Sequence, residues 1–188
     1  MNSIYRVAKD LTQYVYHIQP PKFKGKFILP LSELETEYPE IYRSEFKKYK
    51  DREQHPETKI GLLDCSWKDC VNFSTLDITK IFQLEKLLGV PGYKEVDDIV
   101  VWKFPIEALK DMEFCYYDDN ISPKKKEAYS KVSVRSYKET EFVPDKTVEY
   151  YLEAKNNKER PLLFGYLRHI LVKGKVLIDL AEKITLGG

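Results

Sequence analysis

Runs of β-forming residues separated by polar stretches predict the strands of this chain. They lie at Tyr14–Gln19 (YVYHIQ), 98–104 (DIVVWKF), 113–118 (EFCYYD) and 168–179 (RHILVKGKVLID). Pro20 and Pro105 end the first two runs, as expected where a strand stops. The last run predicts a closing hairpin that turns at Lys173–Gly174.

Apolar residues at helical spacing predict helices at 29–53, 76–89 and 146–157, with a short helical turn at 105–112. In the first helix, Ser32 and Glu35 have the spacing of a capping box, and Pro39 restarts the helix in its first turn. Thr75 is the predicted N-cap of the second helix, and Gly89 is its predicted end.

The stretch 59–74 (KIGLLDCSWKDCVNFS) predicts an extended region. Alternation along a strand would bury Val71 and Phe73 and turn Asn72 and Ser74 toward solvent or a cleft. Cys65 and Cys70 differ by an odd number of positions, so a continuous strand would place their thiols on opposite faces. The spacing therefore argues against a disulfide between them.

Polar residues dominate 118–146, which is predicted to be a loop-rich, mobile insertion. It contains the basic run Lys124–Lys126, which fits a solvated loop. Strands and helices are interleaved irregularly along the rest of the chain. We therefore expect a single α+β domain over 1–188, with a mixed or antiparallel sheet and flanking helices.

The composition is that of a globular protein, with 188 residues, 43% hydrophobic and 32% charged. A formal net charge of +1 gives nucleic-acid binding no electrostatic support, although a local basic groove remains open. The start of the sequence, MNSIYRVAKDL, lacks an apolar signal region, and no apolar run approaches the ~20 residues of a membrane span. With three cysteines in no disulfide pattern, a cytoplasmic location and no membrane association are expected.

Sequence motifs for dinucleotide, P-loop, zinc-protease or serine-hydrolase chemistry are absent from the sequence. The cysteines and histidines are too scattered to form a metal site by spacing, so no metal is expected. The side chains left as candidates are His17 in the first strand, His169 in the last and Arg52 after the first helix. The histidines either make structural hydrogen bonds or share one pocket, and Arg52 binds a phosphate or forms a surface ion pair.

The order of a strand with a histidine (VYHIQ), a helical segment ending in arginine (YKDRE) and a strand CVNFST resembles the ADP-ribosyltransferase-like fold, in particular its DarT-like branch. The resemblance covers roughly residues 15–81 and the last hairpin. It implies NAD as cofactor, bound by His17 and Arg52. The late glutamate of that family is missing, because His169 stands in its place in RHILVKG. The segments HIQP and YPEIY also resemble small proteins of Bacillus-type bacteria, which implies no function.

The expected function is therefore binding of a nucleotide such as NAD, with Asn72 and Ser74 at the ribose or base. If the chain is a divergent ADP-ribosyltransferase or an NAD-cleaving enzyme, His169 or Glu149 would be its general acid or base. Two alternatives stay open. One is a non-enzymatic interaction protein of a defence or phage-related kind with a protein partner. The other is a small RNA-acting toxin that uses the two histidines.

Overall fold

The computed structural model describes residues 12–21, 23–50, 52–90 and 99–186. Within these residues, seven strands form one sheet in the order β11–β6–β1–β5–β9–β7–β8, and every neighbouring pair is antiparallel. The strands are β1 (Tyr14–Ile18), β5 (Cys70–Ser74), β6 (Ile99–Pro105), β7 (Phe114–Asp118), β8 (Tyr129–Lys131), β9 (Arg168–Lys173) and β11 (Glu182–Leu186). The protein is therefore α+β, as the sequence predicts.

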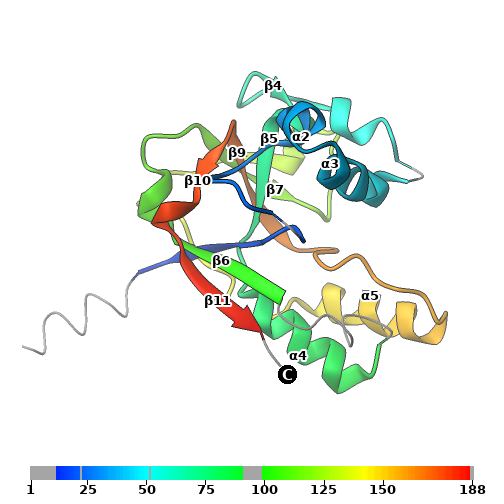
Figure 1. Ribbon diagram of the computed structural model, residues 1–188. Helices are drawn as coiled ribbons and strands as arrows, with labels where there is room; N and C mark the ends of the chain where they lie inside the picture. The colour runs from blue at the N-terminus through cyan, green and yellow to red at the C-terminus, as the bar shows by residue number, and fades with distance from the viewer. Residues whose placement is uncertain (1–11, 22, 51, 91–98, 187–188) are drawn as a thin grey trace, which may run out of the picture.

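The sheet is split between β1 and β5. These two strands share only the pair Tyr16↔Ser74, whereas β1 pairs with β6 along its whole length. In Figure 1, β6 and β11 run across the direction of β5, β9 and β7. We call the junction of β1 and β5 "the split". Two strands that diverge leave room between them, so the split is where a cavity is expected.

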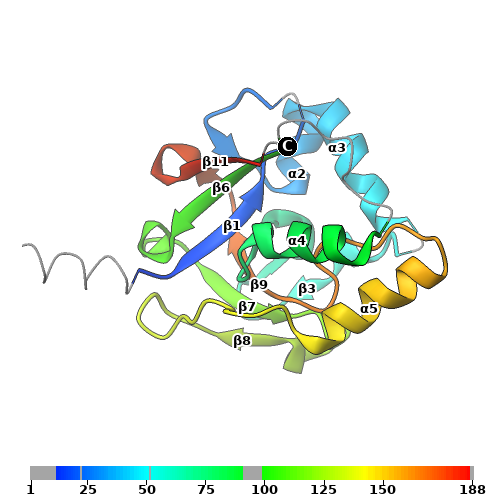
Figure 2. The same ribbon diagram turned by 90° about the horizontal axis from the view of Figure 1, so that it is seen from below.

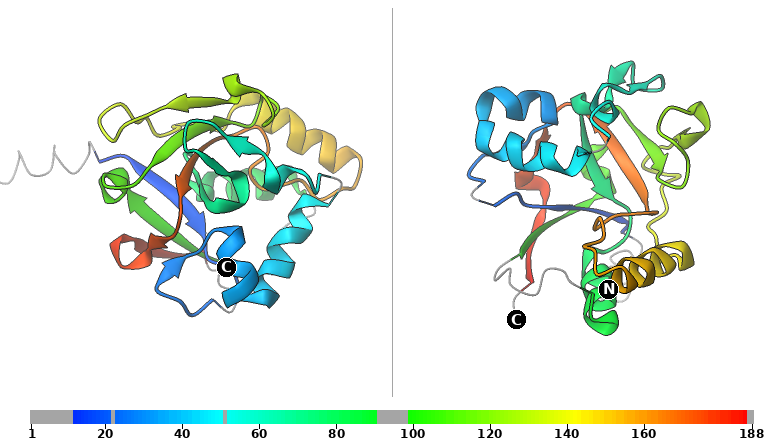
Figure 3. Two further views of the ribbon diagram at one scale, coloured as in Figure 1. Left: turned by 90° about the horizontal axis from the view of Figure 1, so that it is seen from above. Right: turned by 90° about the vertical axis from the view of Figure 1, so that its right-hand side faces the viewer.

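Helices lie at both ends of the split sheet. They are α2 (Leu31–Glu37), α3 (Pro39–Phe46), α4 (Ile78–Leu88) and α5 (Asp145–Asn156), with 3-10 turns η1 (Lys47–Tyr49), η2 (His55–Glu57), η3 (Trp67–Asp69), η4 (Ile106–Leu109), η5 (Lys126–Ala128) and η6 (Ile178–Leu180). Seen from below, α4 and α5 lie side by side in front of the sheet (Figure 2). The views in Figure 3 place α2 and α3 at the opposite end. The core consists of several clusters of buried side chains, and the largest includes Val71, Phe73 and Phe104.

The helix ends differ in part from the sequence prediction. Pro39 does begin α3, and Gly89 ends α4 with a left-handed φ of 64°. The predicted capping box is wrong because α2 begins at Leu31, with Pro30 as N-cap and no side-chain cap, so Ser32 already lies inside the helix. Thr75 is not the cap of α4 either. Its hydroxyl donates to the Arg168 carbonyl, and the cap is Asp77, two residues later.

The predicted closing hairpin is also wrong. After β9 the chain turns at Gly174 (φ 79°), but β10 (Val176–Leu177) pairs with β2 (Phe27–Ile28) in a separate two-stranded sheet. The physical reason is that β9 already has β5 on one side and β7 on the other. No edge of β9 is left for β10, and the hydrogen-bonding groups of β10 pair elsewhere.

Residues 118–146 contain more structure than the predicted loop. They include the edge strand β8, which pairs with β7, and they also contact β1. Tyr137 is buried and its hydroxyl donates to the Tyr14 carbonyl at 2.6 Å, and Glu139 accepts hydrogen bonds from the Tyr14 N–H and the Tyr16 hydroxyl. A loop prediction misses these contacts because each joins residues more than 120 positions apart.

Cys65 and Cys70, which a continuous strand would place on opposite faces, are neighbours in the structure. The Sγ atoms of Cys65 and Cys70 lie 3.4 Å apart, and both cysteines are free thiols. The turn η3 interrupts the predicted continuous strand, so β4 (Cys65–Ser66) pairs with β3 (Lys59–Ile60) and β5 begins only at Cys70. A genuine capping box, Ser66 with Asp69, starts this turn. Burial raises the pKa of both thiols.

Candidate functional site

A cavity of about 90 Å³ lies at the split, beneath α2 and α3. Strands β1, β5 and β6 contribute His17, Asn72 and Trp102 to its lining, and α3 contributes Glu45. Such a volume holds about three waters, and whole small-molecule ligands occupy roughly 300–1,000 Å³. The cavity can therefore accept one end of a ligand, while the remainder would lie outside it.

His17 is fixed at the floor of this cavity. Its ring is parallel to that of Trp102, with centroids 6.0 Å apart, and its Nδ1 lies 2.8 Å from the backbone carbonyl of Asn72. A carbonyl only accepts, so Nδ1 carries the proton and donates it. Burial lowers the pKa of His17 below its usual range, so the ring is neutral at pH 7. Its Nε2 is then left as a hydrogen-bond acceptor.

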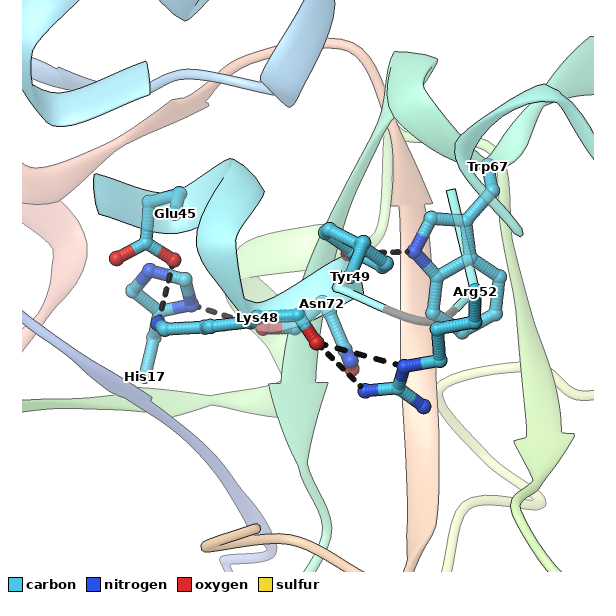
Figure 4. Close-up of polar contacts among 7 residues, drawn as sticks. All are labelled: His17, Glu45, Lys48, Tyr49, Arg52, Trp67 and Asn72. Atoms are coloured by element: carbon cyan, nitrogen blue, oxygen red, sulfur yellow. Dashed lines mark hydrogen bonds and ion pairs between the residues drawn. The ribbon is translucent and has the colours of Figure 1, made fainter. Parts of the chain in front are cut away.

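Asn72 joins the two sides of the split. Its backbone oxygen accepts from His17, while its side-chain Oδ1 is buried with no hydrogen-bond partner among the described residues. A buried amide oxygen without a partner costs about 1–3 kcal/mol, so such atoms are uncommon in folded proteins. Figure 4 shows the Asn72 side chain between His17 and Arg52. Asn72 is also among the residues that line the cavity, which makes this oxygen a candidate acceptor for a ligand.

The segment α3–η1 crosses above these residues. Lys48 forms an ion pair with Glu45 at 2.5 Å, next to His17, and its backbone carbonyl accepts from Nε and Nη2 of Arg52 at 3.4 and 3.3 Å. Tyr49 lines the cavity, and its hydroxyl accepts from Trp67 Nε1 at 2.9 Å. Figure 4 shows these side chains in one row from His17 to Arg52.

Arg52 does not line the His17 cavity. It lies on the surface beyond Tyr49, with its guanidinium 5.6 Å from that ring, and it lines a second, more open hollow of about 520 Å³. This hollow, which we call "the basin", lies between the turn 52–58 and the residues after β7. His17 and Asn72 thus line the cavity, whereas Arg52, farther along the same row, lines the basin.

The two histidines do not share a pocket, contrary to the prediction that they could. Directly opposite residues of antiparallel strands share a face, and the register places Tyr16 opposite Ser74 and Ser74 opposite His169. His17 follows Tyr16 and therefore points to the other face. His169 is only 4% exposed, and its ring contacts those of Tyr117 and Phe164.

Ser74 and Glu149 also lie apart from the row. Ser74 faces the interior, not a cleft, and its hydroxyl donates to the Leu76 carbonyl at 2.8 Å within its own turn. Glu149 is exposed on α5, at the opposite end of the molecule from α3 (Figure 1). Of the carboxylates in the described chain, Glu45 is the one that lines the His17 cavity.

Sequence reasoning missed the aromatic residues that separate the cavity from the basin. Trp67 lines the cavity, and its ring contacts His55 at 4.3 Å and Tyr117 at 4.8 Å, both of which line the basin. We call Tyr49, Trp67, His55 and Tyr117 "the aromatic wall". Only the position of His55, three residues after Arg52, could have indicated it from the sequence.

Comparison of the chain with protein-family models, with curated proteins and with solved structures finds no match. No helix in the described ranges is long and apolar enough to cross a membrane. Among the same residues, no group of three or more histidine, cysteine, aspartate or glutamate side chains is placed to hold a metal ion.

Proposed function

We propose that this protein binds a nucleotide of the NAD type along the row from His17 to Arg52. The observation that carries the proposal is the buried, unpartnered Oδ1 of Asn72, between a neutral histidine and an arginine. In this arrangement the carboxamide or ribose end of the ligand enters the His17 cavity. An N–H or O–H of the ligand donates to Asn72 Oδ1, and Arg52 contacts a phosphate.

The contacts of Arg52 support a role in binding phosphate. Hydrogen bonds to the Lys48 carbonyl and a cation–π contact with the Tyr49 ring orient its guanidinium, which still has further N–H donors. An oriented guanidinium loses less side-chain entropy when it binds a phosphate. The order His17, Arg52, CVNFST is also the order on which the resemblance to ADP-ribosyltransferase-like proteins rests. A glycosyl-transfer reaction would need a carboxylate, for which Glu45 is the candidate at the cavity.

Calorimetric titration of NAD and ADP-ribose tests the proposal. The wild type should bind at micromolar to millimolar concentration, and Arg52→Ala should weaken binding about 10-fold, because hydrogen bonds to charged groups contribute about 1.5–3 kcal/mol. Asn72→Ala should also weaken binding, and it should not lower the thermal midpoint, because Oδ1 has no hydrogen-bond partner to lose.

Arg135→Ala is the matched control, since Arg135 is exposed and lines neither the cavity nor the basin. Absence of binding by the folded wild type at millimolar NAD would refute the proposal. If the Arg52 and Arg135 variants bound NAD with equal affinity, Arg52 would not be part of the nucleotide site.

A further inference from the structure

The basin is a separate hollow of ligand size on the other side of the aromatic wall. Its volume of about 520 Å³ falls within the range of small-molecule sites, unlike the 90 Å³ cavity. The turn 52–58 forms one side, and the residues 119–124 after β7 form the other. Apart from Arg52, none of its lining residues takes part in the nucleotide site proposed above.

His55 lines the basin and carries an unsatisfied polar atom. The residue is only 9% exposed, and its Nε2 is buried with no hydrogen-bond partner in the described chain. Its ring is held edge-on against Trp67 at 4.3 Å and tilted against Tyr49 at 5.6 Å. Burial, with a smaller effect from Arg52, lowers the pKa of His55 to about 4, so the ring is neutral at pH 7. A neutral imidazole can exchange a hydrogen bond with an O–H or N–H group.

Two cations lie on the two sides of the basin. Arg52 belongs to the first side and Lys124 to the second, and neither forms an ion pair with a described residue. The carboxylate of Asp119 accepts hydrogen bonds from the Tyr117 hydroxyl at 3.0 Å and the Tyr166 N–H at 2.9 Å. Glu53 also lines the basin and is exposed. Asp119 is therefore fixed in place, and the cations remain available to an anion.

We propose that the basin binds a small phosphorylated ligand with hydroxyl groups, of the sugar-phosphate class, as a second site. The phosphate lies between Arg52 and Lys124, and a hydroxyl meets His55 Nε2 and the Asp119 carboxylate. Phosphate oxygens suit arginine and lysine donors, and hydroxyls can both donate and accept. This site shares Arg52 with the nucleotide site and otherwise stands apart from it.

Calorimetric titration with ribose 5-phosphate, inorganic phosphate and ribose tests the site. The wild type should bind ribose 5-phosphate most tightly, inorganic phosphate more weakly and ribose not measurably. Lys124→Ala should weaken ribose 5-phosphate binding 5- to 10-fold. Lys125→Ala is the matched control and should leave it unchanged, because Lys125 is exposed on the same loop and does not line the basin.

His55→Phe tests the hydroxyl contact. Phenylalanine keeps a ring against Trp67 but lacks Nε2, so this variant should bind ribose 5-phosphate no better than inorganic phosphate. Thermal melting of each variant verifies that it is folded. The site is refuted if the wild type fails to bind ribose 5-phosphate at millimolar concentration, or if Lys124→Ala and Lys125→Ala have equal affinity.

The two proposals fail separately. Asn72→Ala should lower NAD affinity and leave ribose 5-phosphate affinity unchanged, and Lys124→Ala should do the reverse. If each variant lowered the affinity for both ligands equally, the two ligands would share one continuous site, and the proposal of a second site would be wrong.

Discussion

Three side-chain nitrogen and oxygen atoms in the described chain are buried without a hydrogen-bond partner: Oδ1 of Asn72, Nε2 of His55 and Nδ1 of His169. The first lies in the row at the split, and the second residue lines the basin. The third belongs to a ring buried against Tyr117, behind the aromatic wall. At residue scale, two of the three unsatisfied polar atoms therefore belong to residues of the two proposed sites.

His55 should make stability depend on pH. Its pKa is about 4 in the folded protein against 6.5 for an ordinary histidine, so the unfolded chain binds a proton in this range and the folded chain does not. This contribution to stability is complete above about pH 6.5 and is lost as the pH falls toward 4. Urea unfolding measures the free energy of unfolding at pH 7 and at pH 4.5. Between these two pH values, the wild type should lose about 2 kcal/mol more of this free energy than His55→Phe loses. Equal losses would contradict the lowered pKa of His55.

At the scale of elements, the chain between α5 and β9 is held by a close approach of backbone to side chain. A Cβ placed on Gly165 would lie 2.6 Å from Cε1 of Tyr150, and the hydroxyl of that tyrosine accepts from the Leu162 N–H at 2.7 Å. The Tyr150 ring also meets Tyr166 edge-on at 5.3 Å. These contacts fix the segment that enters β9.

Gly165→Ala should therefore destabilise the protein by about 1–3 kcal/mol, because the methyl group must displace the Tyr150 ring and its hydrogen bond. Gly61→Ala is the control, since a Cβ at that position meets nothing within 4 Å, and its effect should stay within about 0.5 kcal/mol. Chemical denaturation of both variants measures the difference. A Gly165 variant as stable as the Gly61 variant would show that the ring moves without cost.

Across the whole molecule, residues 137–140 join the two halves of the split sheet. Glu139 accepts from the Tyr16 hydroxyl on β1 at 2.7 Å, and the next residue, Thr140, meets Thr75 beyond the end of β5, with hydroxyl oxygens 2.8 Å apart. Direct pairing of β1 with β5 is limited to one residue pair. The segment therefore supplies part of the connection that the strands themselves lack.

A double-mutant cycle of Tyr16→Phe and Glu139→Ala should give a coupling energy of about 1–2 kcal/mol, as expected for a partly buried hydrogen bond to a carboxylate. Tyr129→Phe with Glu139→Ala is the control cycle, because the Tyr129 hydroxyl donates to Pro123 at the β8 edge. That cycle should be additive. Unfolding free energies of the single and double variants provide both values, and additivity in the first cycle would contradict the proposed connection.

The sequence by itself determined the elements whose evidence is local. Alternation predicted that Val71 and Phe73 are buried, Pro20 and Pro105 mark the ends of strands, and Gly89 ends α4. Each of these depends on backbone geometry or burial within a few residues. The α+β class followed from the irregular alternation of such elements.

The tertiary structure decided the pairing and the sites. Strand register places His17 and His169 on opposite faces of the sheet. The turn η3 brings Cys65 next to Cys70. Because both edges of β9 are occupied, β10 pairs with β2. The aromatic wall likewise joins residues from 49 to 117. Contacts between residues distant in the sequence depend on how the whole sheet assembles, because no local propensity specifies which strand becomes a neighbour.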